Sequence, residues 1–174
     1  MAETKIVEKN AVVLRTIAKD VSRDDIITPR IKTILRRMST ALAARADGVA
    51  LAAPQIGEPL RIFIVSGKVF SADAREENPK PQPDRVFINP VMVKQSRTKE
   101  WTEEGCLSVP NWYGEVKRAT RATVQALDKN GKAFTLGASG LLAQVFQHEI
   151  DHLNGILFTD AARNLTKVEP PATL

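Results

Sequence analysis

Apolar side chains recur every three to four residues in two segments of the chain, which is the spacing of a helix that buries one face. The first segment follows Thr28 and Pro29, which are typical of an N-cap and a first helical position, so we expect a helix over about 29–46. The second segment predicts a helix over about 139–153, which the turn-forming Gly155 can end.

Runs of apolar and β-branched residues between these helices predict three strands, over 60–66, 86–95 and 120–128. The sequence Asp-Lys-Asn-Gly at 128–131 is typical of a tight hairpin turn, with a return strand at 134–136. Helices that alternate with strands and hairpins in this way indicate an α+β fold.

The 174 residues suffice for one hydrophobic core, so we expect a single domain over 1–174. Its mixed or antiparallel sheets should pack around a central helix, the one over 139–153. Three prolines and mixed charges at 71–85 favour an exposed loop, and 164–174 has the composition of a frayed tail. No apolar run approaches the ~20 residues of a membrane span, so no membrane association is expected.

Basic residues outnumber acidic ones by 25 to 20, and most of the excess lies in residues 1–47. A solvated helix face explains this excess better than a dedicated nucleic-acid patch. Aromatic residues make up only 5% of the chain, which argues against stacking on single strands, and we expect no sequence-specific nucleic-acid binding. A mildly basic surface would still favour visits to an anionic assembly such as the ribosome.

The N-terminal residues lack the hydrophobic stretch of a secretory signal, and the one cysteine cannot form an internal disulfide. We therefore expect a monomer in the bacterial cytoplasm, although an organellar location stays open.

Both histidines of the chain lie in the sequence Gln-His-Glu-Ile-Asp-His, as His148 and His152 with Glu149 between them. On a helix, residues four apart share a face, so both imidazoles can reach one cation while Glu149 points at its open side. The one cysteine, Cys106, lies in Glu-Gly-Cys-Leu-Ser and would supply a third ligand. Three protein ligands leave a position for water, as in catalytic rather than structural sites.

Each motif alone has a simpler explanation. Two histidines at this spacing are often ordinary helix residues, and a lone cysteine is more often a small buried hydrophobe than a ligand. A third segment, 48–57, is crowded with small residues and contains Gln55. A tightly packed turn after the first helix, with Gln55 exposed to solvent, would explain it.

Together, however, the three segments resemble the signature of peptide deformylases, metal-dependent hydrolases that remove formate from the formylmethionine of newly made chains. The resemblance covers roughly residues 10–160, and the cysteine and histidine motifs match without exception. It implies that Cys106, His148 and His152 bind one divalent ion. Iron(II) would be the native ion, and zinc, nickel or cobalt are possible because one thiolate and two imidazoles suit each of them.

The same resemblance implies roles for the remaining site residues. Glu149 would transfer the proton of the attacking water, while the Gln55 side chain and the Leu107 backbone N–H would stabilise the oxyanion. Nascent formylmethionyl peptides would be the substrate. The residues expected to bind it are Gly48, Val49, Ala50, Leu51, Gly105, Leu141, Val145 and Arg118. For Arg118 a surface salt bridge is an equally good explanation.

Two positions depart from the family pattern. Ala50 stands where a second glycine is usual, so its methyl group would either strain a backbone that needs positive φ or narrow the cleft. Gln144 stands where an apolar pocket residue is expected. Both departures concern substrate fit rather than chemistry.

Two other readings compete with the deformylase. A different His-Glu-x-x-His peptidase would leave the cysteine motif and Gln55 unexplained. An inactive binding module with a structural metal would need a fourth ligand, and no further Cys or His exists in the chain.

Overall fold

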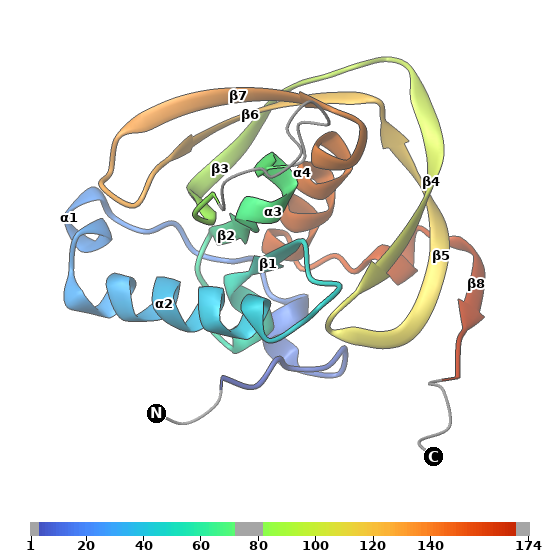
Figure 1. The fold of residues 1–174 in the computed structure, drawn as a ribbon, viewed down its shortest axis with the longest axis horizontal. Helices are drawn as coiled ribbons and strands as arrows, with labels where there is room; N and C mark the ends of the chain where they lie inside the picture. Colours follow the sequence, from blue (N-terminus) through green and yellow to red (C-terminus); the bar gives the residue numbers. More distant parts are fainter. Residues whose placement is uncertain (1–3, 72–81, 170–174) are drawn as a thin grey trace.

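The computed structural model describes residues 4–71 and 82–169, which form two β-sheets and a central helix (Figure 1). The helical elements are η1 Val12–Arg15, α1 Arg23–Ile26, α2 Pro29–Ala43, η2 Ala53–Ile56, α3 Gly67–Ser71, α4 Gly140–Leu153 and η3 Phe158–Asp160. The strands are β1 Ala50–Ala52, β2 Ile62–Val65, β3 Arg85–Gln95, β4 Lys99–Cys106, β5 Val109–Ala119, β6 Arg121–Leu127, β7 Ala133–Ser139 and β8 Arg163–Lys167.

The larger sheet has the strand order β1-β2-β3-β6-β7, and the smaller one has the order β4-β5-β8. All neighbouring strands are antiparallel. Among the described residues the one parallel pairing is an isolated bridge between Lys19 and Leu60. The fold is therefore α+β, as predicted, and of the two expected kinds of sheet it has the antiparallel one.

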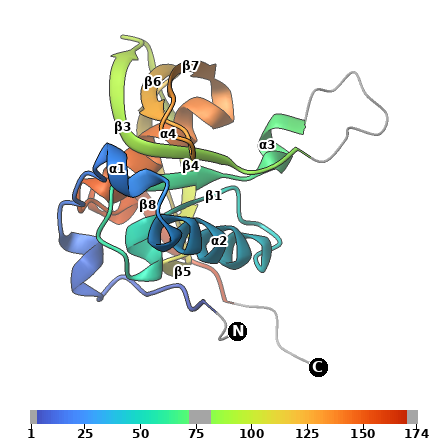
Figure 2. The ribbon, with the colours of Figure 1, turned by 90° about the vertical axis from the view of Figure 1, so that its left-hand side faces the viewer.

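Strand β2 is buried on both faces, which explains its uninterrupted apolar sequence. Because side chains alternate along a strand, Ile62 and Ile64 pack with α2 on one face, while Phe63 and Val65 pack with α4 on the other. In Figures 1 and 2, α2 accordingly runs along the opposite side of the sheet from α4. The larger sheet is thus the central layer between two helices, and α4 also contacts β5 of the smaller sheet.

The two predicted helices are α2 and α4, and the four predicted strands are β2, β3, β6 and β7. Thr28 caps α2, since its Oγ1 accepts a hydrogen bond from the Ile31 N–H at 3.5 Å. The helix ends at Ala43, three residues earlier than predicted, because the chain turns at Arg45, whose N–H donates to the Leu42 carbonyl. The hairpin turn after β6 also forms, with Asp128 Oδ1 accepting from the Asn130 N–H at 2.8 Å.

The prediction of a frayed tail over 164–174 is wrong for its first part. Arg163–Lys167 forms β8, which pairs with β5. The guanidinium of Arg163 lies 3.7 Å from the Trp101 ring centre, and Asn164 donates a hydrogen bond to Glu115 at 2.6 Å. Residues 170–174 lie outside the described residues.

The predicted loop over 71–85 lies mostly at 72–81, outside the described residues. Its two ends do not belong to a loop: Ser71 ends α3, and Arg85 begins β3 and pairs with Val65. In the described part of the chain, no helix has the length and apolar character needed to cross a membrane.

Candidate metal centre and cleft

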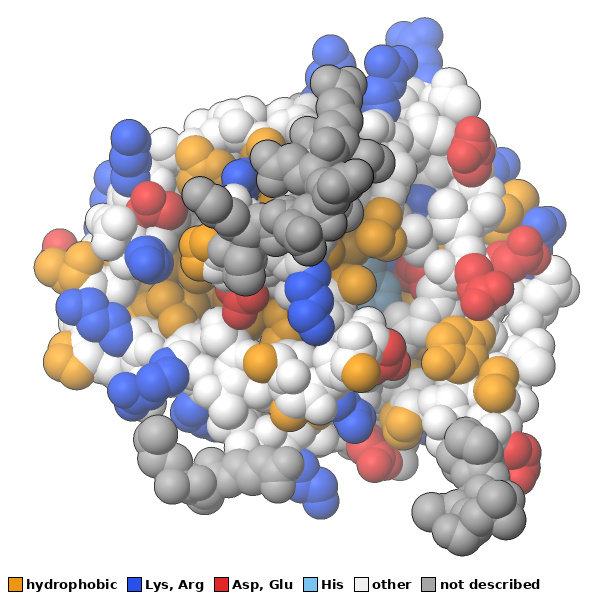
Figure 3. Space-filling model, in the orientation of Figure 1, with side chains coloured by type: hydrophobic (Ala, Val, Ile, Leu, Met, Phe, Trp, Pro, Cys, Tyr) orange, Lys and Arg blue, Asp and Glu red, His pale blue; other side chains and the backbone are white. Residues whose placement is uncertain are grey.

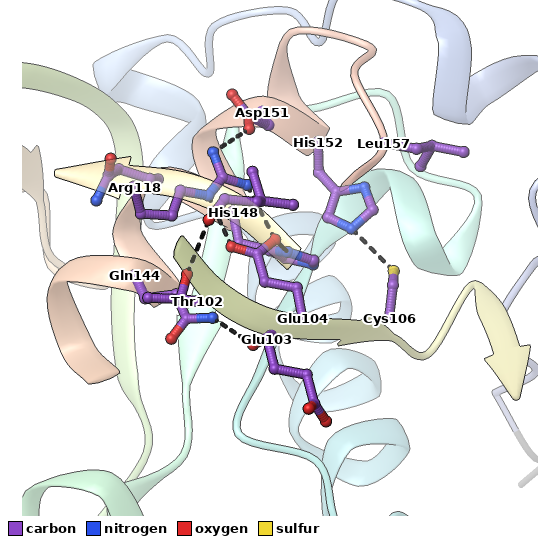
Figure 4. A network of polar contacts seen from close by, with 12 residues as sticks. Thr102, Glu103, Glu104, Cys106, Arg118, Gln144, His148, Asp151, His152 and Leu157 are labelled. Atoms are coloured by element: carbon purple, nitrogen blue, oxygen red, sulfur yellow. Dashed lines mark hydrogen bonds and ion pairs between the residues drawn. The ribbon is translucent and has the colours of Figure 1, made fainter. Parts of the chain in front are cut away.

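Cys106, His148 and His152 meet where the end of β4 faces α4. The Cys106 sulfur and one nitrogen from each imidazole all lie within 4.8 Å of one another. The sulfur is 3.2 Å from His152 Nε2, and Figure 4 shows the two side chains directed at each other. The histidines are one turn apart on α4, so their ring centres are 4.9 Å apart. The spacing in the sequence thus produces the expected three-ligand cluster.

Glu104 orients His148 within this cluster. Its Oε2 lies 2.9 Å from His148 Nδ1, so Nδ1 carries the proton and donates to the carboxylate. The other ring nitrogen, Nε2, is then the one that a metal ion can bind by displacing its proton. Burial alone lowers the pKa of His148, but the contacts with Cys106 and Glu104 outweigh it and raise that pKa well above its usual value. The acidic groups around this ring therefore favour positive charge.

Arg118 and Asp151 hold Glu104 in place. The Arg118 guanidinium donates to both Glu104 oxygens, at 2.7 and 3.0 Å, and to Asp151 Oδ2 on α4 at 2.6 Å (Figure 4). Burial alone would raise the pKa of Glu104, but the hydrogen bonds from His148 and Arg118 lower it to about 2. Glu104 is therefore a fixed carboxylate behind the histidine.

Glu149 carries a carboxylate oxygen that no protein group satisfies. The residue is 3% exposed, and Oε2 has no hydrogen-bond partner among the described residues. Burial raises the pKa of this carboxyl group to about 7. Glu149 lines the cleft beside the cluster, so its free oxygen can serve a ligand that enters there.

Gln55 points its amide nitrogen at the cluster. The Ala52 N–H donates to Gln55 Oε1 at 2.8 Å, which fixes the orientation of the amide. Its Nε2 then lies 3.2 Å from Ser108 Oγ and 3.6 Å from Cys106 Sγ. The explanation of Gln55 as a solvated turn residue is thereby excluded, since the side chain is 2% exposed.

A cleft of about 500 Å³ opens onto this cluster. Figure 3 shows histidine surface at the bottom of a hollow on this face of the molecule. Most predicted site residues line the cleft: Gly48, Val49, Ala50, Gln55, Gly105, Cys106, Leu107, Leu141, Val145, His148 and Glu149.

Three predicted site residues do not line the cleft. His152 is 1% exposed and reaches the cluster from behind. The side chain of Leu51 is buried in the core beneath β1, so only its backbone is left to contact a substrate. Arg118 is neither at the end of a substrate slot nor on the surface, because its buried guanidinium is engaged by Glu104 and Asp151.

Both departures from the family pattern are resolved in structural terms. Ala50 lies in β1 and is not among the residues with positive φ, so its methyl group causes no backbone strain. The residue lines the cleft and also belongs to the buried core cluster that includes Val145. Gln144 donates a hydrogen bond from Nε2 to the Glu103 carbonyl at 2.8 Å and thereby connects α4 to β4 across the cleft (Figure 4).

Sequence reasoning missed the roles of Glu104 and Tyr113. Glu104 could have been found as a carboxylate directly beside the Gly-Cys pair, where a solvated strand position does not explain it. Tyr113 lines the cleft and explains Gly105, because a Cβ at that glycine would lie 2.8 Å from Tyr113 Cε1. No pattern in the sequence indicated Tyr113.

The residues present fit a metal ion. One thiolate and two imidazoles form a three-ligand donor set, and the hydrogen bond from Glu104 sets the tautomer of His148. An unsatisfied carboxylate oxygen lies beside them. A histidine pair on a helix, a third ligand from a strand and an open cleft define a metal-dependent hydrolase.

Comparisons with known proteins identify the kind of hydrolase. The family model described as polypeptide deformylase matches residues 3–168. A peptide deformylase of Carboxydothermus hydrogenoformans is 42% identical over 167 residues, covering 96% of this chain and 98% of that protein. The chain belongs to the peptide deformylase family, whose members remove the N-formyl group from nascent peptides.

Solved structures agree with this assignment. A peptide deformylase from Synechococcus elongatus in complex with actinonin has a TM-score of 0.79 and 36% identity, covering 92% of this chain and 81% of that one. A Met-Ala-Ser-bound peptide deformylase from Acinetobacter baumannii has a TM-score of 0.79 and 30% identity, covering 92% and 99%. The competing readings, another peptidase or an inactive binding module, find no support in these similarities.

Proposed function

We propose that the protein hydrolyses formylmethionyl peptides at the cleft above Cys106, His148 and His152. The observation that carries this proposal is the three-ligand cluster beside the unsatisfied Oε2 of Glu149. A water molecule would add its oxygen to the formyl carbon, the bond from that carbon to the methionine nitrogen would break, and formate would leave.

The three ligands would hold one divalent ion. Such an ion supplies Lewis acidity, which lowers the pKa of water and polarises the formyl oxygen. The donor set suits iron(II), zinc, nickel and cobalt, and resemblance to the family favours iron(II) as the native ion.

Glu149 would move the proton. Its Oε2 faces the cleft without a competing donor, so it can accept a proton from the attacking water and deliver it to the leaving methionine nitrogen. Because the carboxylate is buried, bulk water does not compete for this hydrogen bond.

Gln55 and Leu107 would stabilise the oxyanion. The Gln55 amide nitrogen is directed at the cluster, and Leu107 follows Cys106 on the cleft wall. A preorganised donor of this kind typically contributes about 2.7–4 kcal/mol to transition-state stabilisation.

The peptide would lie between β1 and β4, each of which is an edge strand of its sheet. Backbone groups of residues 48–51 and of Gly105 would pair with an extended chain, as in strand addition. Val49, Leu141 and Val145 would form the apolar slot for the methionine side chain. The Met-Ala-Ser peptide bound to the Acinetobacter baumannii protein supports a peptide in this cleft.

The test is formate release from a short formylmethionyl peptide by protein handled without oxygen, with metal content measured on the same sample. Glu149→Gln should keep the metal and the fold but lower kcat by at least about a hundredfold, because the amide cannot accept a proton. Glu103→Gln is the matched control, since this carboxylate also lines the cleft but is exposed. Near-normal turnover by Glu149→Gln at full metal occupancy would contradict the assignment.

The proposal extends to the cellular setting. The protein would act as a monomer in the bacterial cytoplasm and meet its substrate at the surface of the ribosome. Gel filtration and light scattering test the first statement, and co-sedimentation with ribosomes tests the second.

A further inference from the structure

Four basic residues lie within or beside two connections between the sheets that run side by side. The chain passes from β3 to β4 through residues 96–98 and from β5 to β6 at Thr120. We call this group the basic corner, and it consists of Lys94, Arg97, Lys99 and Arg121.

Hydrogen bonds hold the two connections together. The Ser96 N–H donates to the Arg121 carbonyl at 2.9 Å, and the Thr120 N–H donates to the Thr98 carbonyl at 3.1 Å. The Arg121 N–H in turn donates to Ser96 Oγ at 3.1 Å. The four cations therefore project from a fixed backbone frame, not from independent loops.

The charges of the basic corner are not neutralised. All four side chains are exposed, and none forms an ion pair with a carboxylate of residues 4–71 or 82–169, whereas Arg15, Arg37 and Arg163 do. The segments 91–99 and 117–127 contain no Asp or Glu. Figure 3 shows Lys and Arg side chains at the upper edge of the molecule, above the ends of β3 and β4 in Figure 1.

A concentration of unpaired cations on a rigid frame raises the local positive potential and selects a polyanion. A membrane-surface site typically uses an amphipathic helix with a broad apolar face. The basic corner is built instead from strand ends, where the hydroxyl groups of Ser96 and Thr120 both donate to the Thr98 carbonyl and so stiffen the frame from which the cations reach phosphate oxygens. The proposed substrate is a nascent chain, which the protein would meet at the surface of the RNA-containing ribosome. The polyanion near this substrate is therefore RNA, and in this respect the inference rests on the proposed function.

We propose that the basic corner binds the phosphate backbone of folded RNA without reading its sequence. The binding surface lies on strands β3, β4 and β6 rather than on the basic face of α2. It is also separate from the cleft, since none of its four residues lines that cavity.

The experiment measures binding of a labelled RNA hairpin by fluorescence anisotropy at several salt concentrations. The variant Lys94→Gln, Arg97→Gln, Arg121→Gln should weaken binding at least about tenfold at low salt. A plot of log affinity against log salt concentration has a negative slope, and its magnitude should decrease by about 2–3. The reason is that each lost phosphate contact removes about 0.7–0.9 from that magnitude. The variant Arg30→Gln, Lys32→Gln, Arg36→Gln on α2 removes the same charge and should weaken binding less than about twofold.

Equal losses in the two variants would overturn the proposal, because net charge alone would then explain binding. It would also be overturned if the wild-type protein bound vesicles of acidic phospholipid through these residues but did not bind the RNA. Formate release from a short peptide should be unchanged in both variants. That readout tests folding and the proposed function separately from RNA binding.

Discussion

Ala50 lines the cleft at a position where the family pattern has glycine. Its side chain is 7% exposed and lines the same cavity as Glu149 and Cys106. Since its backbone is extended and unstrained, substitution at this position changes space and little else. Ala50 therefore offers a direct measure of how tightly the acyl group is held.

Replacement of Ala50 by glycine should relax discrimination between acyl groups. An acetyl group is one methyl larger than formyl, and we expect it to be a poor substrate of the wild-type protein. In Ala50→Gly, kcat/KM for an acetyl-Met peptide should rise by about tenfold, the usual lower limit for one methyl-sized difference in a pocket. The formyl reaction should change less than about threefold.

The measurement is kcat/KM for formyl- and acetyl-Met peptides with both proteins. Leu141→Ala is a useful control, because it enlarges the proposed methionine slot instead of the acyl site. Equal wild-type rates on the two acyl groups would show that the site is not specific for formyl.

At the level of elements, the position of α4 against β5 depends on two polar side chains. Gln147 forms hydrogen bonds with both the N–H and the carbonyl of Ala119, at 2.9 and 3.0 Å. Arg118 links β5 to β4 through Glu104 and to α4 through Asp151. The histidines are thus positioned through Gln147, Arg118 and Asp151, none of which lines the cleft.

Replacement of Arg118 by methionine should destabilise the fold. It keeps the apolar stem but leaves the carboxylates of Glu104 and Asp151 without their partner, at side-chain exposures of 2% and 28%. Loss of one member of a buried ion pair costs about 3–5 kcal/mol. For a domain of this size each kcal/mol lowers Tm by about 2–4 °C, so we expect a fall of about 6–20 °C.

Arg15→Met is the matched control, because the Arg15–Asp160 pair is 45% and 38% exposed and such pairs contribute at most about 1 kcal/mol. Both variants should be melted in the presence of a chelator, which separates folding from metal binding. Equal small shifts would show that the buried network does not hold α4.

The elements that the sequence predicted are those with a regular apolar pattern. Strand β4 lacks one, because its inward positions include Glu104, which is buried only through its ion pair and its contact with His148. In β5 the inward positions include Gly114 and Arg118, and in β8 every residue is exposed. Apolar periodicity could not identify strands whose burial depends on polar partners or on an edge position.

At the scale of the whole molecule, the site joins segments that lie far apart in the chain. Gln55 comes from the segment that follows the edge of the larger sheet, Cys106 comes from the smaller sheet, and the histidines come from α4. Spacing within a motif predicted that His148 and His152 share a helix face. It could not establish that these segments meet. The ligand chemistry of Cys106 suggested that it joins the histidines, but only the resemblance to a family with the same motifs indicated that Gln55 lies beside them.

A bound ion would therefore connect the smaller sheet to α4, so its removal should lower the stability of the entire domain. A ligand present at about a thousand times its Kd stabilises the folded state by about 4.1 kcal/mol. At about 2–4 °C per kcal/mol, chelation should lower Tm by about 8–16 °C. His152→Ala removes one of the three ligands, so chelation should change its Tm by less than about 3 °C on the same scale.

The measurement is differential scanning calorimetry with and without chelator, followed by re-addition of iron(II) under anaerobic conditions. Iron(II) should restore the Tm of the wild-type protein but not raise that of His152→Ala. A chelator effect of the same size in His152→Ala would mean that the stabilising ion binds somewhere else, whereas no effect on the wild-type protein would mean that the cluster does not contribute to folding.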